Sequence, residues 1–327
     1  MRSNERQSDR DQNSPFPDAH TLDRLQSYRE SPQTGESTLH RQRVLISGTS
    51  SGFGALSARR LAQAGHHVYA GMRDIDSRHS ATAAALREFA HDHELSIEVL
   101  ELDVTLTDSV TACVDHIRAA GGLDAVVHNA GVAAAGLTET FTADNAERIF
   151  AVNVVGVVRL QHALLPLLRD SSQAASIYVT STLAREVMPF LSVYSASKHA
   201  LDALAEGWRY ELGQIGIRTV IIQPGTFPTT GMLTRLIQPG APDRAEAYGA
   251  FAEAPGGLFA GLQDMIAAGA APDPMLVADA TLAALSPEAP TRIVVDPAGN
   301  GSTARLNAAS RAEQQALLTG LGLTNLD

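Results

Sequence analysis

The chain has 327 residues but only one lysine and one cysteine. Of its 25 Lys and Arg side chains, 24 are arginine, and Lys198 is the exception. Phosphate-binding loops of the form G-x-x-x-x-G-K-[ST] need a lysine directly after the second glycine, whereas Lys198 follows a serine. That class of nucleotide-binding site is therefore excluded. The single cysteine, Cys113, can form neither an intramolecular disulfide nor a zinc site built from cysteine thiolates.

Long apolar runs and basic clusters are also missing. No uninterrupted apolar run reaches the roughly 18 residues of a membrane span, and the N-terminal residues lack the apolar core of a secretory signal. The formal net charge of −11 and the lack of a basic run argue against a nucleic-acid partner. The histidines at 66–67 and 91–93 do not have the spacing of a known metal motif. We expect a soluble, cytoplasmic protein with no metal site, no nucleic-acid partner and no membrane span.

Apolar runs and helical segments alternate along most of the chain. Residues 1–40 contain only seven hydrophobic side chains, so we expect a flexible tail there. Strands are predicted at residues 44–47, 68–70, 97–102, 125–127, 176–180, 218–222 and 292–295. Helices are predicted at residues 55–64, within 77–93, at 108–120, about 145–168, about 195–215 and near 276–285.

Short apolar strands separated by helices are typical of a parallel sheet that is covered on both faces. The sequence therefore predicts an α/β fold, a doubly wound Rossmann fold with about seven parallel strands, in one domain over residues 41–300. A lid is expected at about 227–275, and residues 301–327 are expected to form a helical C-terminal tail.

A glycine-rich loop joins the first predicted strand to the first helix, with the spacing G-x-x-x-G-x-G. Glycines allow the backbone to turn tightly and to approach a pyrophosphate, and the N-terminus of the following helix offers free N–H groups to it. The loop predicts a dinucleotide site. Its cofactor-binding residues are expected to be Gly48, Ser50, Ser51, Gly52, Phe53 and Gly54.

The same loop also fits G-x-S-x-G, the nucleophile elbow of α/β-hydrolases, with Ser50 as the nucleophile. Those hydrolases place several strands before the elbow and a catalytic histidine near the C-terminal end. Here the loop follows the first strand, and no histidine occurs after His199. A serine hydrolase is therefore the less favoured alternative.

The end of the second predicted strand should select the cofactor. An acid about 20 residues beyond the loop binds the ribose 2′-OH of NAD, whereas an arginine there would bind the 2′-phosphate of NADP. Arg73 and Asp74 are the candidates. We favour Arg73 and NADP(H) over NAD(H), with ribose binding by Asp74 as the alternative.

Tyr194 and Lys198 open the long helix predicted at 195–215. Their spacing of four residues stacks the two side chains on one face of a helix. A tyrosine ionises near 10, and an adjacent ammonium stabilises its phenolate. The pair is suited to acid–base chemistry, although a lone Y-x-x-x-K is a weak motif.

With this pair and the glycine loop, the chain resembles the short-chain dehydrogenase/reductase family, over about residues 42–296. Its hydroxysteroid and retinol dehydrogenase branch is the most similar. Further positions that match in order are Asp103, Val104, Asn129, Ala130, Gly131, Asn153, Ser181, Pro224, Gly225 and Thr229. The resemblance implies adenine contacts at 103–104, closure over the cofactor at 129–131, and contacts to the nicotinamide end at 224–229.

The resemblance also implies a catalytic set. Tyr194 would be the general acid or base, and Lys198 would lower its pKa and bind the nicotinamide ribose. Ser181 would polarise the substrate oxygen, and Asn153 would hold a water in the proton relay. The implied function is an NADP(H)-dependent oxidoreductase that interconverts an alcohol with a ketone or aldehyde. A catalytically inactive NADP-binding sensor is the alternative.

Two segments bear on substrate and partners. The lid is apolar, which suggests an apolar substrate. The alternative is that its apolar side chains only pack against one another. These side chains are Phe227, Met232, Leu233, Leu236, Ile237, Phe251, Leu258, Phe259, Leu262 and Met265. The helix after Tyr194 has a charged flank, Asp202, Glu206 and Arg209. Its small-residue stripe, which predicts a homodimer or homotetramer, comprises Ala196, Ala200, Ala203 and Gly207.

Overall fold

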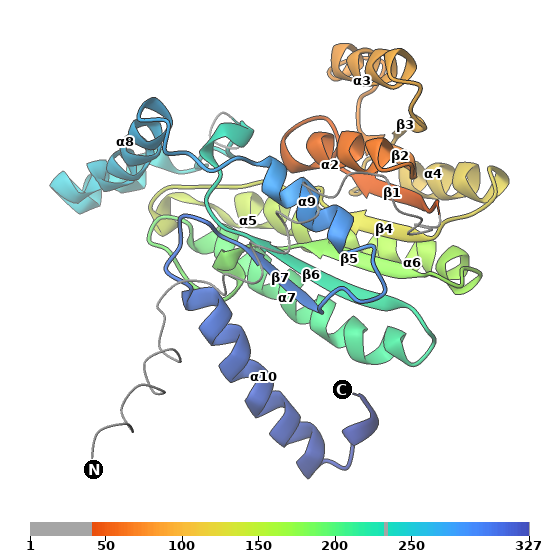
Figure 1. The fold of residues 1–327 in the computed structure, drawn as a ribbon. Helices are drawn as coiled ribbons and strands as arrows, with labels where there is room; N and C mark the ends of the chain where they lie inside the picture. Colours follow the sequence, from red (N-terminus) through yellow and green to blue (C-terminus); the bar gives the residue numbers. More distant parts are fainter. Residues whose placement is uncertain (1–40, 232–234, 327) are drawn as a thin grey trace, which may run out of the picture.

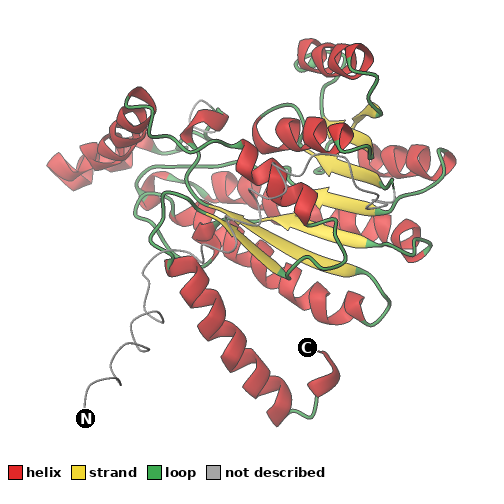
Figure 2. Ribbon diagram, viewed as in Figure 1, coloured by secondary structure: helices red, strands yellow, loops and turns green. Residues whose placement is uncertain are grey.

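The computed structural model describes residues 41–231 and 235–326. Seven parallel strands form one sheet in the order β3-β2-β1-β4-β5-β6-β7, with helices on both faces (Figures 1 and 2). The strands are β1 (Arg43–Ser47), β2 (His67–Met72), β3 (Ile97–Glu101), β4 (Ala125–His128), β5 (Ala175–Val179), β6 (Arg218–Pro224) and β7 (Arg292–Val295). The predicted doubly wound Rossmann fold is confirmed. The predicted tail, residues 1–40, lies outside the described residues.

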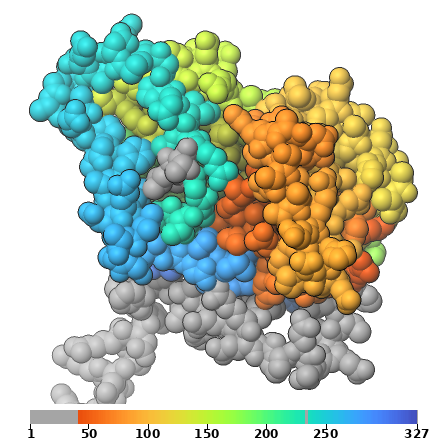
Figure 3. Space-filling view, turned by 90° about the horizontal axis from the view of Figure 1, so that it is seen from above, coloured from red at the N-terminus to blue at the C-terminus, as the bar shows by residue number. Residues whose placement is uncertain are grey.

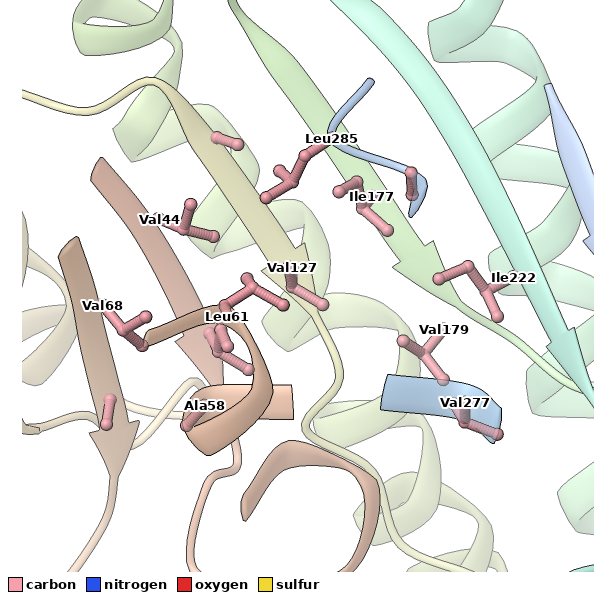
Figure 4. Packing of buried hydrophobic residues seen from close by; sticks show 14 of the residues in the cluster. Val44, Ala58, Leu61, Val68, Val127, Ile177, Val179, Ile222, Val277 and Leu285 are labelled. Carbon is pink, nitrogen blue, oxygen red and sulfur yellow. The ribbon is translucent and has the colours of Figure 1, made fainter. Parts of the chain in front are cut away.

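Alternate residues of each strand pack into two cores, one on each face of the sheet. Val44 and Ile46 belong to one cluster and Leu45 to the other. The first cluster is shown in Figure 4 and is covered by α2 (Gly52–Gln63), α3 (Ser80–Asp92) and α9 (Met275–Ala283). The second is covered by α4 (Thr107–Ala119), α6 (Gly156–Arg169) and α7 (Ser192–Gly213). Burial on both faces explains why the strands are apolar runs without alternation.

The strand order indicates where a ligand-binding crevice lies. β1 is followed by β2 and β3 on one side, and β4 starts the other half of the sheet on the opposite side. In open α/β sheets, ligands bind at the carboxyl ends of the strands beside such a switch point. The glycine loop after β1 and the segment after β4 both lie at this place.

A long helix carries Asn153. It consists of α5 (Ala143–Phe150), the π-helical segment η2 (Ala151–Val155) and α6. Over residues 143–169 it is long and apolar enough to cross a membrane, by length and composition alone, with a mean hydropathy of 1.5 in its most apolar window. Polar residues such as Asn153 and Gln161 interrupt its apolar sequence. Leu160, Leu164 and Leu168 of this helix are fully buried in the second core.

The remaining elements lie at the carboxyl edge of the sheet and beyond β7. The short helical turns are η1 (Thr138–Thr140), η3 (Thr182–Ala184), η4 (Pro228–Thr230), η6 (Pro242–Glu253) and η7 (Thr324–Leu326). The α-helices are α8 (Ala254–Ala267) and α10 (Ser302–Gly320). No side chain of α8 is buried. In Figure 3 the segment after β6, in cyan, lies beside the start of α2, in red.

Candidate active site

Tyr194 and Lys198 lie one turn apart near the start of α7. Lys198 is only 5% exposed, and its Nζ donates a hydrogen bond to Val179 O at 3.1 Å, at the end of β5. The same Nζ lies 5.9 Å from the centroid of the Tyr194 ring. The helix therefore holds an ammonium and a phenol side by side at the carboxyl edge of the sheet.

Burial moves the pKa of both groups toward their neutral forms. It lowers the pKa of Lys198 to about 8. It also raises the pKa of Tyr194 to about 12, while a hydrogen bond with Ser181 acts in the opposite direction. The sequence argument expects the ammonium to lower the tyrosine pKa, whereas burial is the largest effect in the structure and raises it. Tyr194 is therefore a phenol at neutral pH, able to donate a proton.

Ser181 lies two residues after the end of β5, directly before η3, and is 7% exposed. Its Oγ accepts a hydrogen bond from Leu183 N at 3.1 Å and so starts η3. The hydrogen bond with Tyr194 brings the serine and the tyrosine together, although they lie thirteen residues apart in the sequence. Two hydroxyl groups can thus converge on one substrate oxygen.

Asn153 is fully buried in the π-helical segment η2. Its Oδ1 accepts a hydrogen bond from Val132 N at 2.9 Å, and its Nδ2 donates to Val132 O and to Ser197 Oγ, both at 2.9 Å. Ser197 Oγ donates in turn to Tyr194 O at 2.7 Å. Asn153 therefore connects the segment after β4 with the start of α7. Irregular helical turns of this kind are frequent at functional sites.

The glycine loop is folded tightly against the segment after β4. Gly48 has a φ of 75°, and a methyl group placed on it would lie 2.7 Å from Ala130 Cα. A methyl group on Gly54 would lie 2.3 Å from Gly48 O. Asn129 Nδ2 donates to Gly48 O at 3.1 Å, and Ala130 N donates to Ser47 Oγ at 3.0 Å. Side chains larger than hydrogen cannot enter at either glycine without moving the backbone.

The N-terminus of α2 is free to bind an anion. Ser51 precedes the helix, and its side chain makes no capping hydrogen bond. The first N–H groups of a helix have no partners within the helix, and its dipole favours negative charge there. Phe53 packs edge-on against Phe227, with ring centroids 5.4 Å apart, which fixes the first turn. These residues fit the pyrophosphate of a dinucleotide.

The segments after β2 and β3 form the other end of the crevice. Arg73 is exposed, and Asp74 has a left-handed φ of 57°. Asp74 N and Ile75 N both donate to the Glu101 carboxylate at 3.0 Å. Asp103 Oδ1 accepts from Thr105 N at 2.8 Å, and Val104 is buried. Glu101 was missed by the sequence analysis, since nothing in its own surroundings marks it as the anchor of this turn.

The segment after β6 approaches the glycine loop. Pro224 is buried at the end of β6, and Gly225 N donates to Val295 O at 2.8 Å. Thr229 is exposed, whereas its neighbour Thr230 is the residue that reaches Gly52. A methyl group on Gly52 would lie 3.3 Å from Thr230 O. The structure thus brings together the predicted positions after β1, β4, β5 and β6, with Arg73 and Asp103 at the β2–β3 end.

Two other kinds of site find no support in the part of the chain that the structure describes. No group of three or more His, Cys, Asp or Glu side chains there could hold a metal ion. Nor does any histidine of residues 41–231 and 235–326 hydrogen-bond Ser50, which a nucleophile elbow would require.

We expect the Lys198→Met variant to be more stable than the wild type at neutral pH. A lysine pKa lowered from 10.5 to about 8 corresponds to roughly 3 kcal/mol of destabilisation of the fold. This holds at pH values low enough for Lys198 to be charged in both the folded and the unfolded protein. As the pH rises from about 8 to about 10.5, the folded wild type releases this proton before the unfolded chain does, so its stability recovers. Urea unfolding at pH values of about 7 and 10 measures the difference.

The control for this variant is Leu201→Met, a buried exchange on the same helix that carries no charge. Its effect on the free energy of unfolding should be the same at both pH values. If the difference between Lys198→Met and the wild type does not shrink at the higher pH, the buried ammonium is not its cause.

Comparison with known proteins agrees with this geometry. The family model for short chain dehydrogenases matches residues 42–239, more than half of the chain. The uncharacterized oxidoreductase YusZ of Bacillus subtilis (strain 168) is 34% identical over 200 residues, which are 61% of this chain and 69% of that protein. Retinol dehydrogenase 8 of Homo sapiens is 33% identical over 189 residues, which are 57% of this chain and 59% of that protein.

Solved structures show the same architecture. A short-chain dehydrogenase from Streptomyces avermitilis has a TM-score of 0.65 at 26% identity, covering 86% of this chain and 96% of that one. A 3-ketoacyl-(acyl-carrier-protein) reductase from Brucella melitensis, complexed with NADH, has a TM-score of 0.64 at 25% identity, covering 79% and 97%. A gluconate 5-dehydrogenase from Burkholderia cenocepacia, in complex with NADP and tartrate, has a TM-score of 0.54 at 26% identity, covering 58% and 73%. The chain therefore belongs to the short-chain dehydrogenase/reductase family and is an oxidoreductase of that family.

Proposed function

We propose that the protein is an NADP(H)-dependent oxidoreductase that interconverts an apolar alcohol with its ketone or aldehyde. The observation that carries the proposal is the convergence of Ser181, Tyr194 and Lys198 at the carboxyl edge of the sheet, beside the glycine loop and the free N-terminus of α2. Ser181, Tyr194 and Lys198 are suited to proton transfer, and the glycine loop is suited to binding the dinucleotide.

In the reductive direction, the bound nicotinamide supplies the hydride. The substrate oxygen gains negative charge, and the Tyr194 phenol donates its proton to it. Ser181 Oγ donates a second hydrogen bond to the same oxygen. The nearby Lys198 ammonium, charged below a pKa of about 8, stabilises the phenolate that Tyr194 leaves behind. Asn153, whose amide bonds Val132 and Ser197, positions the start of α7.

Arg73 supports a preference for NADP over NAD. Its side chain is exposed at the end of β2, while Glu101 holds the following Asp74 and Ile75 amides and so fixes the turn. A guanidinium there can bind a 2′-phosphate through charge and paired hydrogen bonds. Among the similar structures, one complex holds NADP and another holds NADH, so the comparisons support NAD(P) binding in general.

Replacing Arg73 with alanine is expected to weaken NADP binding by about tenfold to a hundredfold, because a hydrogen-bonded charge pair is lost. The Kd for NAD should stay within about twofold of the wild type. Isothermal titration with both cofactors measures the ratio. Arg78→Ala, which removes an exposed arginine from the same loop, is the control. If the ratio of the Kd values for NADP and NAD is unchanged in the Arg73 variant, Arg73 does not bind the 2′-phosphate.

Aromatic side chains between the lid and α7 support an apolar substrate. Phe190 lies two residues before the start of α7, and its ring centroid is 5.8 Å from that of Phe251 in η6. Tyr248 stacks beside Phe251 at 6.5 Å. Phe251 is 56% exposed, and no side chain of α8 is buried, so the lid does not enclose an apolar core of its own there. Its apolar surface is available to a ligand. Met232 and Leu233 lie outside the described residues.

The experiment that tests the function is an NADPH-consumption screen with aldehydes and ketones of graded size and polarity. We expect the rate to rise with apolar surface and to disappear when Tyr194 is phenylalanine. If the protein binds NADPH tightly but reduces nothing in the panel, the inactive NADP-binding sensor becomes the better description.

We further propose a cytoplasmic homodimer or homotetramer that assembles through α7. Ala196 and Ala203 of its small-residue stripe are exposed, and a methyl group on Gly207 would meet nothing within 4 Å. Val155 and Val158, on the neighbouring helix, are 49% and 38% exposed. Such a surface allows helices of two copies to approach closely. Light scattering that gives a monomer mass at all concentrations would contradict the assembly.

A further inference from the structure

Arg235 reaches from the segment after β6 back to the glycine loop. Its Nη1 donates a hydrogen bond to Ser51 Oγ at 2.6 Å, and its Nε donates to Gly231 O at 3.3 Å. Ser51 is the last residue before α2, so the guanidinium lies at the N-terminus of that helix. A methyl group placed on Gly52 would lie 3.3 Å from Thr230 O of the same segment. The segment after β6 therefore lies beside the glycine loop at two neighbouring residues, and Arg235 bonds one of them.

The positive charge of Arg235 has no carboxylate partner in the part of the chain that the structure describes. Within residues 41–231 and 235–326, no Asp or Glu forms an ion pair with it, whereas Arg43 pairs with Asp124, and Arg60 pairs with Asp279. A guanidinium offers five N–H donors, and a hydroxyl and a carbonyl occupy only two of them. The N-terminus of α2 adds its own free N–H groups and the positive end of its dipole. Two positive groups thus lie beside one neutral hydroxyl, an arrangement that an anion would stabilise.

We propose that Arg235 binds a phosphate group of the dinucleotide cofactor and holds the segment after β6 over the glycine loop. The inference rests on the proposed cofactor site and adds to it a residue that no cofactor motif of the sequence marks. Arg235 is the only basic residue between positions 219 and 243. Arginine binds phosphate oxygens through two parallel N–H bonds, which are stronger than its bonds to Ser51 and Gly231 O. Cofactor binding would exchange those neutral partners for the phosphate.

Two phosphate sources are possible, and they differ between the cofactors. The pyrophosphate is common to NADP and NAD, whereas the 2′-phosphate occurs in NADP alone. Arg73 lies after β2, on one side of β1, while Arg235 follows β6, on the other side. Comparing the two cofactors therefore separates the sources.

The test measures Kd for NADP and for NAD by isothermal titration of the full chain, for the wild type, Arg235→Gln, Arg235→Lys and Arg244→Gln. Arg244 lies in the same segment, is 61% exposed and pairs with Glu139, so it is a matched control. We expect Arg235→Gln to weaken binding by about tenfold or more, because a charge-assisted contact is lost. Arg235→Lys should recover part of the affinity, and the control should stay within about twofold.

Equal weakening for both cofactors assigns Arg235 to the pyrophosphate, and weakening for NADP alone assigns it to the 2′-phosphate. Unchanged Kd values for both cofactors in Arg235→Gln would overturn the inference while leaving the proposed cofactor site intact. If the wild type bound neither cofactor, the proposed function itself would fail. Arg235 is exposed, so a far-ultraviolet circular dichroism spectrum should show that the variant folds normally.

Discussion

The Tyr194→Phe variant is expected to lose carbonyl reduction by about 10²- to 10⁴-fold in kcat while it still binds NADPH with a nearly unchanged Kd. The phenol is the group that can give a proton to the substrate oxygen, because burial raises its pKa to about 12 and keeps it protonated at neutral pH. Phenylalanine keeps the ring and its packing but carries no proton to donate. Stopped-flow or steady-state NADPH oxidation gives kcat, and titration gives Kd.

Tyr210→Phe is the matched control, since Tyr210 lies on the same helix with its ring 4.2 Å from the Arg209 guanidinium. It should keep its activity within about twofold. If Tyr194→Phe kept more than about a tenth of the wild-type kcat, another group would have to donate the proton. If it lost NADPH binding as well, the residue would be structural rather than catalytic.

Most of the fold could be predicted because the sheet is parallel and buried on both faces. A strand such as 44–47 is then a short apolar run that ends at a glycine, which a sequence shows directly. The motifs after the first, fourth, fifth and sixth strands also follow from this, since parallel strands bring their carboxyl ends to one edge. The pairing of Ser181 with Tyr194, in contrast, came from the resemblance to the short-chain dehydrogenase/reductase family.

Contacts between distant segments could not be predicted in the same way. The π-helical turn at Asn153 depends on hydrogen bonds to Val132 and Ser197, which come from other elements. Arg235 belongs to no motif of the sequence, and its hydrogen bond to Ser51 depends on how the chain folds. The sequence also placed Asp202 and Glu206 on a charged flank of α7, yet they are only 2% and 8% exposed. Their partners lie up to 90 residues away in the chain.

Those two carboxylates belong to a buried network behind the catalytic end of α7. Arg292, at the start of β7, donates to Asp202 Oδ1 and Oδ2 at 2.9 and 3.0 Å and to Glu206 Oε2 at 2.8 Å. Arg185, four residues after Ser181, also pairs with Asp202, at 3.0 Å. Arg292 and Arg209 lower the pKa of Glu206, against the effect of its burial. The network thus ties β7 and the Ser181 segment to the helix that carries Tyr194.

Replacing Arg292 with methionine is expected to lower the free energy of unfolding by about 3–5 kcal/mol at pH 7, because two buried carboxylates lose a cation. That is a large part of the roughly 5–15 kcal/mol that stabilises a typical domain. Arg118→Met is the control, since Arg118 pairs with Asp115 on the surface, where both side chains are more than half exposed. Its effect should be below about 1 kcal/mol. Urea unfolding measures both.

The pH dependence separates this electrostatic cause from a loss of packing. A carboxyl with a lowered folded pKa adds stability above its unfolded value, near 4.5 for Glu206, and this stability is lost as the pH falls through the folded pKa. In the methionine variant Glu206 keeps only its pairing with Arg209, so the carboxyl retains less of that advantage, and protonation removes the charge that has lost Arg292. The difference in the free energy of unfolding between the variant and the wild type should therefore become smaller as the pH falls below about 5. A difference that is the same at pH values of about 4 and 7 would mean that Arg292 stabilises the fold through its packing alone.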